Sequence, residues 1–149
     1  MTSVSPKIKP VVALEVDNAN ASKRSWLSRL KLDHFRNYQQ ADLPIHAGQL
    51  VVLGDNGAGK TNLLEAVSLL APGRGMRRAK TEHLAYRASG FETTSGIADN
   101  DDADRLDWAV AATLENEDGT LQIGTGVPPS AKQGNRIMRL EGVTVSQAD

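Results

Sequence analysis

Residues 50–66 read LVVLGDNGAGKTNLLEA and contain the pattern G-x-x-x-x-G-K-[ST], which runs from Gly54 to Thr61. This pattern has a physical meaning only between a strand and a helix. The short apolar run at residues 50–53 predicts a strand buried on both faces. After Lys60, apolar residues recur at the spacing of an amphipathic helix, at Leu63, Leu64, Val67 and Leu70.

Three glycines give this stretch the expected geometry of a phosphate-binding loop. Glycines at positions 54, 57 and 59 let the backbone wrap closely around an anion, with its N–H groups pointing inward. The helix that begins near Lys60 adds unpaired N–H groups and the positive end of its dipole. Lys60 is expected to reach the β- and γ-phosphates of a nucleotide, and the Thr61 hydroxyl to ligate the Mg²⁺ ion that bridges them.

Length, charge and composition limit the number of domains, the binding partners and the kinds of site that the chain can have. The 149 residues suit one domain that can bury a core. A formal net charge of −1 gives no overall attraction to DNA or to an anionic membrane, so contact with nucleic acid needs a local basic patch. The chain has no cysteine, which excludes disulfides and thiolate metal sites and suits the cytoplasm. No apolar run approaches the ~20 residues of a membrane-spanning helix.

The chain before the phosphate loop is predicted to contain a tail and two strands. Residues 1–25 mix proline, serine and asparagine with one short apolar patch, which predicts a disordered extension. Alternation of apolar and polar residues at positions 30–33 predicts a half-buried strand. A second strand is predicted at residues 41–45, and Pro44 makes it an edge strand or an irregular one because proline cannot donate to a ladder.

The segment HFRNY at residues 34–38 joins these two strands. We expect Phe35 and Tyr38 to pack in the core rather than to stack on nucleic-acid bases. Arg36 has two possible roles: a solvated turn residue, or a ligand of a nucleotide or of DNA. The residues alone favour the solvated turn residue.

A basic stretch follows the phosphate-loop helix, which has to end by about Ala71 because a Pro-Gly pair comes next. Residues 73–80 are the most basic part of the chain and are loosened by glycines. They could bind the phosphates of a nucleotide or of DNA. They could equally form an ordinary solvated loop, and the sequence does not decide between these roles. Thr81 is expected to cap a short helix that reaches Tyr86.

The last part of the chain predicts a small antiparallel β region over about residues 107–145. Strands at 107–115 and 120–125 are joined by a loop that ends in Asp-Gly, which is a hairpin signal. A second hairpin is predicted from 136–140 and 143–145. No apolar strand ending in Asp or Glu follows the phosphate loop, although phosphate-loop ATPases use such a residue to hold Mg²⁺. We therefore expect an α/β fold with an incomplete core sheet, the N-terminal part of a longer ATPase.

Three segments resemble the RecF family of ABC-type, SMC-like DNA repair ATPases. Residues 29–38, RLKLDHFRNY, resemble the opening strand and turn of that family. Residues 54–66 resemble its phosphate loop, including the Thr-Asn and Glu-Ala pairs after the lysine. Residues 68–79 resemble the segment that follows. The core NGAGK is shared by ABC-type and SMC-like ATPases in general, whereas FRNY and KTNLLEA narrow the resemblance to RecF.

The resemblance implies that residues 26–149 are the N-terminal portion of an ABC-type ATPase head. It places Mg²⁺ on Thr61, gives Lys60 the catalytic role and makes Arg36 a candidate on the nucleotide or DNA side. The signature motif and the second acidic motif of the family are expected beyond Asp149, so this chain alone is expected neither to hydrolyse ATP nor to form an ATP-dependent dimer. ATP is placed on Gly54, Asp55, Asn56, Gly57, Ala58, Gly59, Lys60 and Thr61, with Asn62 close by.

The function implied by the resemblance is DNA replication and repair in the cytoplasm. RecF proteins bind ATP and DNA, dimerise, and help RecO and RecR to load RecA at single-strand gaps in recombinational repair and the SOS response. The departures from the family pattern are the long N-terminal tail and the loops near Asp99 and Pro128, which look like insertions.

Other phosphate-loop proteins fit less well. A small GTPase needs D-x-x-G and N-K-x-D elements, and the sequence contains neither. Many metabolite kinases begin directly with the phosphate loop, whereas two strands are predicted before it here. Transport subunits of ABC type normally continue Lys-Ser-Thr, where this chain has Lys60-Thr61-Asn62. The remaining alternative is another SMC-like or ABC ATPase, or a fragment that holds a nucleotide without turnover.

Overall fold

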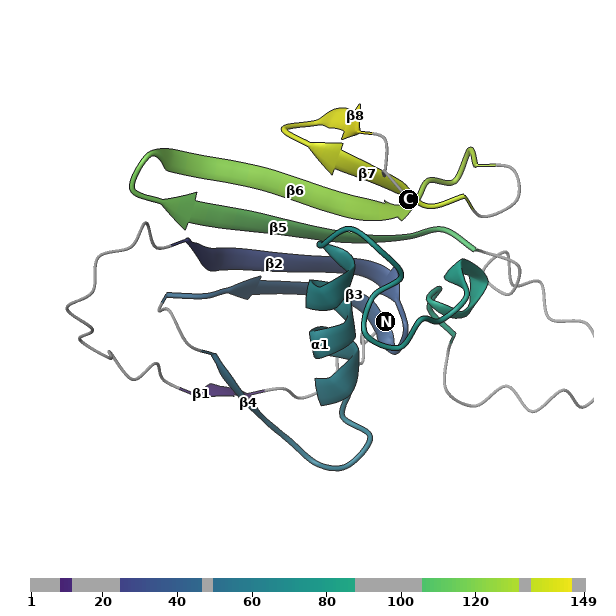
Figure 1. Cartoon of the computed structure of the whole chain (residues 1–149). Coiled ribbons are helices and arrows are strands. Elements are labelled where there is room, and N and C mark those ends of the chain that lie inside the picture. The colour runs from purple at the N-terminus through teal and green to yellow at the C-terminus, as the bar shows by residue number, and fades with distance from the viewer. Residues whose placement is uncertain (1–8, 12–24, 47–49, 88–105, 132–134, 146–149) are drawn as a thin grey trace, which may run out of the picture.

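The structure, a computed structural model, describes residues 9–11, 25–46, 50–87, 106–131 and 135–145. Most of these residues form an antiparallel sheet of six strands in the order β3-β2-β5-β6-β7-β8 (Figure 1). The strands are β2 (Trp26–Phe35), β3 (Tyr38–Pro44), β5 (Trp108–Asn116), β6 (Gly119–Val127), β7 (Ile137–Leu140) and β8 (Val143–Val145).

The predicted hairpins are confirmed, and they belong to a larger sheet than the sequence indicated. β5 pairs with β6 and β7 pairs with β8, both antiparallel. β5 also pairs with β2, from Trp26↔Glu115 to Asp33↔Ala109, which the sequence did not predict. Strands from before and after the phosphate loop therefore form one sheet. β3 is an outer strand of this sheet, as Pro44 predicted.

One face of the sheet carries the core. Along β5, Trp108, Val110 and Ala112 are buried while the alanines between them are exposed, which is the alternation expected of a strand with one covered face. Phe35 and Tyr38 are fully buried, as predicted. The core cluster consists of Leu30, Leu32, Phe35, Tyr38, Ile45, Leu63, Ala66, Leu69, Leu70, Leu84, Ala85, Trp108, Val110, Ala112 and Val127.

The phosphate-loop helix α1 (Lys60–Leu69) contributes to this core, and in Figure 1 it crosses in front of the lower strands of the sheet. Its buried face differs in part from the predicted one. Leu63 and Leu70 are buried as predicted, but Leu64 and Val67 are 60% and 41% exposed, and their places in the core are taken by Ala66 and Leu69. Two apolar stripes run along this helix at helical spacing, so periodicity alone could not show which one faces the sheet. In the described ranges, no helix is long and apolar enough to cross a membrane.

The strand before the phosphate loop is not buried as predicted. β4 (Val51–Leu53) pairs with β1 (Lys9–Val11) in a separate two-stranded sheet. Val51 and Leu53 are 51% and 53% exposed, because within the described part of the chain β1 is the one strand beside β4. β1 falls in the predicted disordered tail, whose other residues, apart from residue 25, lie outside the described ranges.

The predicted helix at Thr81 is shorter than expected and is not capped by Thr81. A single 3₁₀ turn, η1 (Thr81–His83), has Lys80 as its N-cap, with no side-chain capping bond. The chain then straightens, because Ala85 forms a β-bridge with Phe35. The Thr81 carbonyl accepts a hydrogen bond from the Trp108 indole N–H at 3.1 Å, which fixes η1 against the end of β5.

Candidate phosphate-binding site

The loop between β4 and α1 has the backbone that its sequence predicted. Gly57 and Gly59 have φ angles of +85° and +97°, in the left-handed region that glycine tolerates. Gly59 is the N-cap of α1, which has no side-chain capping bond and no acidic residue in its first turn. The first N–H groups of a helix have no partner within the helix, so this helix end can receive an anion.

The Lys60 ammonium group lies over the phosphate loop. Nζ donates hydrogen bonds to the Gly54 carbonyl at 2.6 Å and to the Asp55 carbonyl at 2.7 Å. A phosphate oxygen is a stronger acceptor than a carbonyl, so Lys60 can exchange these partners for a nucleotide. Thr61, the next residue, is exposed. Because Mg²⁺ usually takes one or two protein ligands and completes its shell with phosphates and water, the Thr61 hydroxyl fits this role.

The turn between β2 and β3 packs directly against the end of the phosphate loop. A Cβ atom added to Gly59 would lie 2.6 Å from Asn37 Nδ2 and 2.7 Å from the Tyr38 hydroxyl oxygen. The Tyr38 hydroxyl donates to the Gly59 carbonyl at 3.1 Å in a buried contact. Burial raises the pKa of Tyr38 to about 12, so the hydroxyl keeps its proton at neutral pH. Position 59 therefore needs glycine for two reasons: its φ angle is positive, and there is no space for a Cβ atom.

Three successive residues, 36–38, contact the N-cap of α1 and two positions within α1, at intervals of three residues. The contacts pair Arg36 with Glu65, Asn37 with Asn62 and Tyr38 with Gly59. We call residues 36–38 the positioning turn, because they hold both the end of the phosphate loop and the first turns of α1.

Arg36 is not the solvated turn residue that its local sequence favoured. Nε and Nη2 donate to the two Glu65 carboxylate oxygens at 2.9 and 2.8 Å, and Nη1 donates to the His83 carbonyl at 2.8 Å. The side chains of Arg36 and Glu65 are only 20% and 2% exposed. A carboxylate buried this deeply needs a cation beside it. A contact of Arg36 with nucleotide or DNA stays a prediction.

The basic loop, residues 73–80, is fixed along α1. The Ser68 hydroxyl donates to the Glu65 carbonyl at 2.7 Å and accepts a hydrogen bond from the Met76 N–H at 2.9 Å. Gly75 allows this close approach, since a Cβ there would lie 2.7 Å from Leu69 Cδ2. This loop therefore does not simply extend into solvent, although its basic side chains are exposed.

Arg136 holds the other end of α1. Its Nη2 donates to the Leu69 carbonyl at 2.6 Å, its Nη1 to the Gly73 carbonyl at 2.7 Å and its Nε to the Thr125 hydroxyl at 2.7 Å. Burial lowers the pKa of Arg136, while the negative end of the helix dipole suits a cation at this place. The antiparallel sheet thus contributes directly to the position of the phosphate-loop helix.

Asn37, Glu65 and Arg136 also belong to the site, although the sequence did not single them out. Glu65 gave no usable signal, because its burial depends on which side of α1 meets the sheet. Arg136 gave none, since its carbonyl partners on and after α1 lie 67 and 63 positions away in the sequence.

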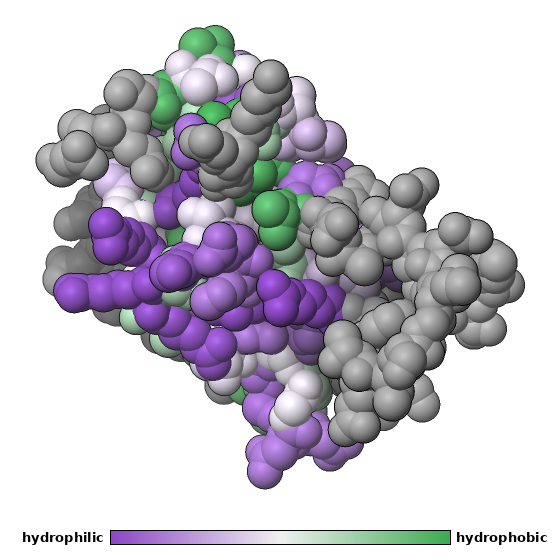
Figure 2. Space-filling model, turned by 90° about the vertical axis from the view of Figure 1, so that its right-hand side faces the viewer, coloured by the Kyte–Doolittle hydropathy of each residue, from purple (hydrophilic) through white to green (hydrophobic). Residues whose placement is uncertain are grey.

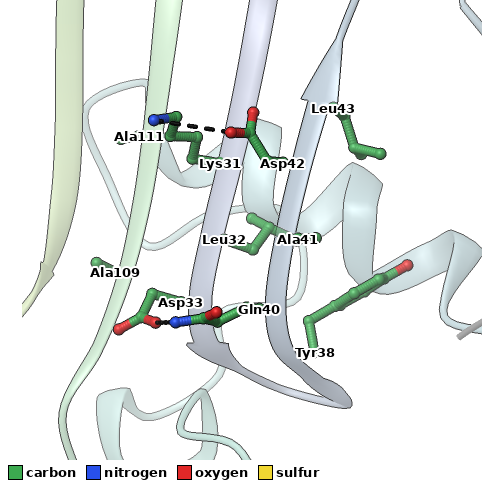
Figure 3. Close-up of a pocket in the computed structure, with 10 residues that line it drawn as sticks. All are labelled: Lys31, Leu32, Asp33, Tyr38, Gln40, Ala41, Asp42, Leu43, Ala109 and Ala111. Carbon is green, nitrogen blue, oxygen red and sulfur yellow. Dashed lines mark hydrogen bonds and ion pairs between the residues drawn. The ribbon is translucent and has the colours of Figure 1, made fainter. Parts of the chain in front are cut away.

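A separate pocket of about 620 Å³ lies over β2, β3 and β5 (Figure 3). Its charged and polar residues pair with one another: Lys31 lies 3.7 Å from Asp42, and the Gln40 amide donates to Asp33 at 3.3 Å. Arg29 also binds Asp42 and lowers the pKa of that carboxyl group. The residues that line this pocket include none of the phosphate loop, and we assign no ligand to the pocket.

Comparisons with known proteins agree with this geometry. The profile of the RecF/RecN/SMC N terminal domain matches residues 26–140. The chain is 44% identical over 123 residues to the DNA replication and repair protein RecF of Rhizobium johnstonii, and 40% identical over 128 residues to that of Mesorhizobium japonicum. These matches cover 83% and 85% of the chain but 29% of each relative, so the chain spans less than a third of their length.

A solved structure of the recombination mediator protein RecF-ATP in the RecFOR pathway shares the fold. The two superpose with a TM-score of 0.59 at 23% identity, over 83% of this chain and 29% of the other. The family match covers the positioning turn, the phosphate loop, α1 and every strand of the antiparallel sheet except β8. This chain therefore belongs to the RecF/RecN/SMC N-terminal domain family, in its RecF branch.

Proposed function

We propose that this chain forms the ATP-binding part of a RecF-type DNA replication and repair protein. The observation that carries the proposal is the uncapped N-terminus of α1, preceded by a loop with two left-handed glycines and covered by Lys60. ATP would lie on residues 54–61, where Lys60 would exchange its two carbonyl partners for phosphate oxygens. The Thr61 hydroxyl would ligate Mg²⁺, and Asn62 would lie close to the nucleotide.

The names of the relatives extend the proposal to DNA and to partner proteins. The similar proteins are called DNA replication and repair protein RecF, and the solved structure belongs to the RecFOR pathway. We infer that the intact protein binds DNA near single-strand gaps in the cytoplasm and works with RecO and RecR to help RecA load, in recombinational repair and the SOS response. We expect ATP hydrolysis and ATP-dependent dimerisation from a full-length RecF protein.

The alternative function is nucleotide binding without turnover. ATP hydrolysis in this class of enzymes needs an acidic Mg²⁺ ligand and a group that orients the attacking water. Phosphate release by the chain, measured beside ATP binding, separates the two functions.

The direct test is the equilibrium affinity for ATP with Mg²⁺, measured by calorimetry on the wild type and on Lys60→Ala. Removing a charged hydrogen-bond donor to phosphate is expected to weaken binding at least ~10-fold. Lys31→Ala is the matched control, since Lys31 is a 55% exposed lysine on the opposite face of the sheet, and its affinity should equal that of the wild type. Equal affinities of the wild type and Lys60→Ala would refute the proposed site.

A further inference from the structure

A pocket of about 230 Å³ lies on the uncovered face of the antiparallel sheet, over β2, β5, β6 and β7. Three of the side chains that line it are cations, Arg29, Lys31 and Arg139, and among the described residues of its lining none is acidic. The helix α1 packs with the core on the opposite face of the sheet, so this pocket is separate from the phosphate loop. We call it the cationic pocket.

The strand register brings cations to this pocket from two sides. Residues that are paired directly across neighbouring strands point to the same face of a sheet. One such row crosses the pocket and consists of Lys31 on β2, Ala111 on β5, Gly124 on β6 and Arg139 on β7. Neighbouring strands lie ~4.8 Å apart, so the backbone positions of Lys31 and Arg139 are separated by ~14 Å. A polypeptide segment between them can reach both cations.

The cations of the pocket differ in how firmly they are held. Arg29 donates two hydrogen bonds to the Asp42 carboxylate, at 2.7 and 2.6 Å. Lys31 lies 3.7 Å from the same carboxylate, beyond hydrogen-bonding distance (Figure 3). Arg139 is exposed, and its side chain has no hydrogen-bonding or ion-pair partner among the described residues. Arg139 is therefore free to bind an anion, and Lys31 can turn towards one.

Gly124 keeps the floor of the cationic pocket open. Glycine is unfavourable inside a strand and often marks a place where another molecule approaches closely. The φ angle of Gly124 is not positive, and a Cβ there would make only an ordinary contact, 3.6 Å from the Val110 carbonyl oxygen. Gly126 differs, because a Cβ there would collide with the Trp108 carbonyl oxygen. The described packing thus requires glycine at position 126 but not at position 124.

Acidic side chains around the pocket disfavour a nucleic-acid backbone. Asp33 and Asp42 lie beside the pocket on β2 and β3, and Glu141 follows β7 at the turn into β8. A DNA duplex carries one negative charge per about 1.7 Å of its axis. A duplex that reached the cationic pocket would therefore bring phosphates close to these carboxylates as well. A short segment with one or two carboxylates of its own can enter the pocket without meeting them.

We propose that the cationic pocket binds a short acidic segment of another protein, whose carboxylates pair with Arg139 and Lys31. The planar guanidinium group of Arg139 can hold a carboxylate through two parallel hydrogen bonds, so it makes the main contact. Lys31 supplies the second positive charge. This inference does not rest on the proposed binding of ATP and DNA.

The test measures, by fluorescence anisotropy, the affinity of the intact protein for a short glutamate-rich peptide that carries a fluorescein label. The same peptide with glutamine in place of every glutamate is the control ligand. The glutamate peptide should bind, more weakly as the salt concentration rises, and the glutamine peptide should not. Arg139→Ala should weaken binding about fivefold or more, as expected for a charge-assisted hydrogen bond at an exposed site, with partial recovery in Arg139→Lys.

Gly124→Val tests the shape of the pocket separately from its charge. The added side chain should fill the floor and abolish peptide binding, and the fold should tolerate it because valine suits a strand and its Cβ has space.

Arg74→Ala is the matched control variant. Arg74 is an exposed arginine of the basic loop, which is fixed along α1 on the other side of the sheet. Figure 2, which views the molecule from the side of η1, shows hydrophilic residues across the middle of that side. Arg74→Ala should bind the glutamate peptide as the wild type does. Arg139→Ala should keep the wild-type affinity for ATP, so that this inference and the proposed function can fail separately.

Several outcomes would overturn the inference. Absence of binding by the glutamate peptide, or equal affinity for the two peptides, would reject an acidic ligand. Equal peptide affinities of the wild type, Arg139→Ala and Gly124→Val would place the acidic segment elsewhere on the protein. A single-stranded oligonucleotide that binds more weakly to Arg139→Ala than to Arg74→Ala would make the pocket a phosphate site instead. Thermal unfolding of each variant checks that the fold is retained.

Discussion

Gly59 and Gly54 end the same loop in different surroundings. Gly59 is buried against the positioning turn, where a Cβ would lie within 3 Å of Asn37 and Tyr38. Gly54 is exposed, and among the described residues a Cβ there would approach only Ala58 within 4 Å, at 3.3 Å. The helix end of the phosphate loop is thus fixed by a turn 21 positions earlier in the chain, whereas its strand end follows the exposed β4. A phosphate-loop sequence gives the loop its shape, and contacts outside the motif give it a fixed position.

Glu65→Ala is the change with the largest expected effect on this arrangement. It would leave Arg36 part-buried without its carboxylate, and breaking a buried ion pair costs about 3–5 kcal/mol of unfolding free energy. The adjacent Leu64→Ala is the control, because Leu64 is 60% exposed and its truncation should cost less than about 1 kcal/mol. Urea unfolding of both variants measures the difference. Similar losses for the two variants would contradict the buried contact between α1 and the positioning turn.

Tyr38→Phe tests the same contact with a smaller change. Removing the hydroxyl deletes its hydrogen bond to Gly59 and should cost about 1 kcal/mol of unfolding free energy at neutral pH. A tyrosine in the unfolded chain loses its proton near pH ~10, whereas folded Tyr38 keeps it until about pH 12. In that window the native state binds more protons than the unfolded state, so stability falls as pH rises, by up to ~1.4 kcal/mol per pH unit.

The stability curves of the wild type and Tyr38→Phe are therefore expected to cross between pH 10 and 12. Below pH 10 the wild type should be the more stable protein, because its tyrosine is protonated in both states. Above the crossing Tyr38→Phe should be the more stable one. Urea unfolding at a series of alkaline pH values measures the unfolding free energy of the wild type and of Tyr38→Phe. Parallel curves over the whole range would show that the Tyr38 hydroxyl is not buried at Gly59.

Local sequence signals predicted the elements well where the structure depends on neighbours in the chain. The glycines and Lys60 predicted the phosphate loop and the start of α1, and Asp-Gly predicted the hairpin turn at Gly119. Pro44 correctly indicated an outer strand, because a missing N–H restricts a strand wherever it lies. The resemblance to RecF was confirmed by the family match.

The sequence could not predict features that depend on what packs beside an element. The exposure of Val51 and Leu53 depends on which strands flank β4, and the burial of Ala66 instead of Val67 depends on which side of α1 meets the sheet. Arg36 was ambiguous for the same reason, because its partner Glu65 lies 29 positions away. Apolar periodicity identifies a helix with a buried face, but the choice of face is a tertiary property.

The most direct test of the positioning turn is the affinity for ATP with Mg²⁺ of Asn37→Ala beside Gln40→Ala. Asn37 contacts Gly59 and accepts a hydrogen bond from Asn62, whereas Gln40 lies on the same hairpin and binds the exposed Asp33. Loss of one hydrogen bond of about 1 kcal/mol should weaken ATP binding about fivefold in Asn37→Ala, with wild-type affinity in Gln40→Ala. Wild-type affinity in both variants would show that the phosphate loop holds its shape without the positioning turn.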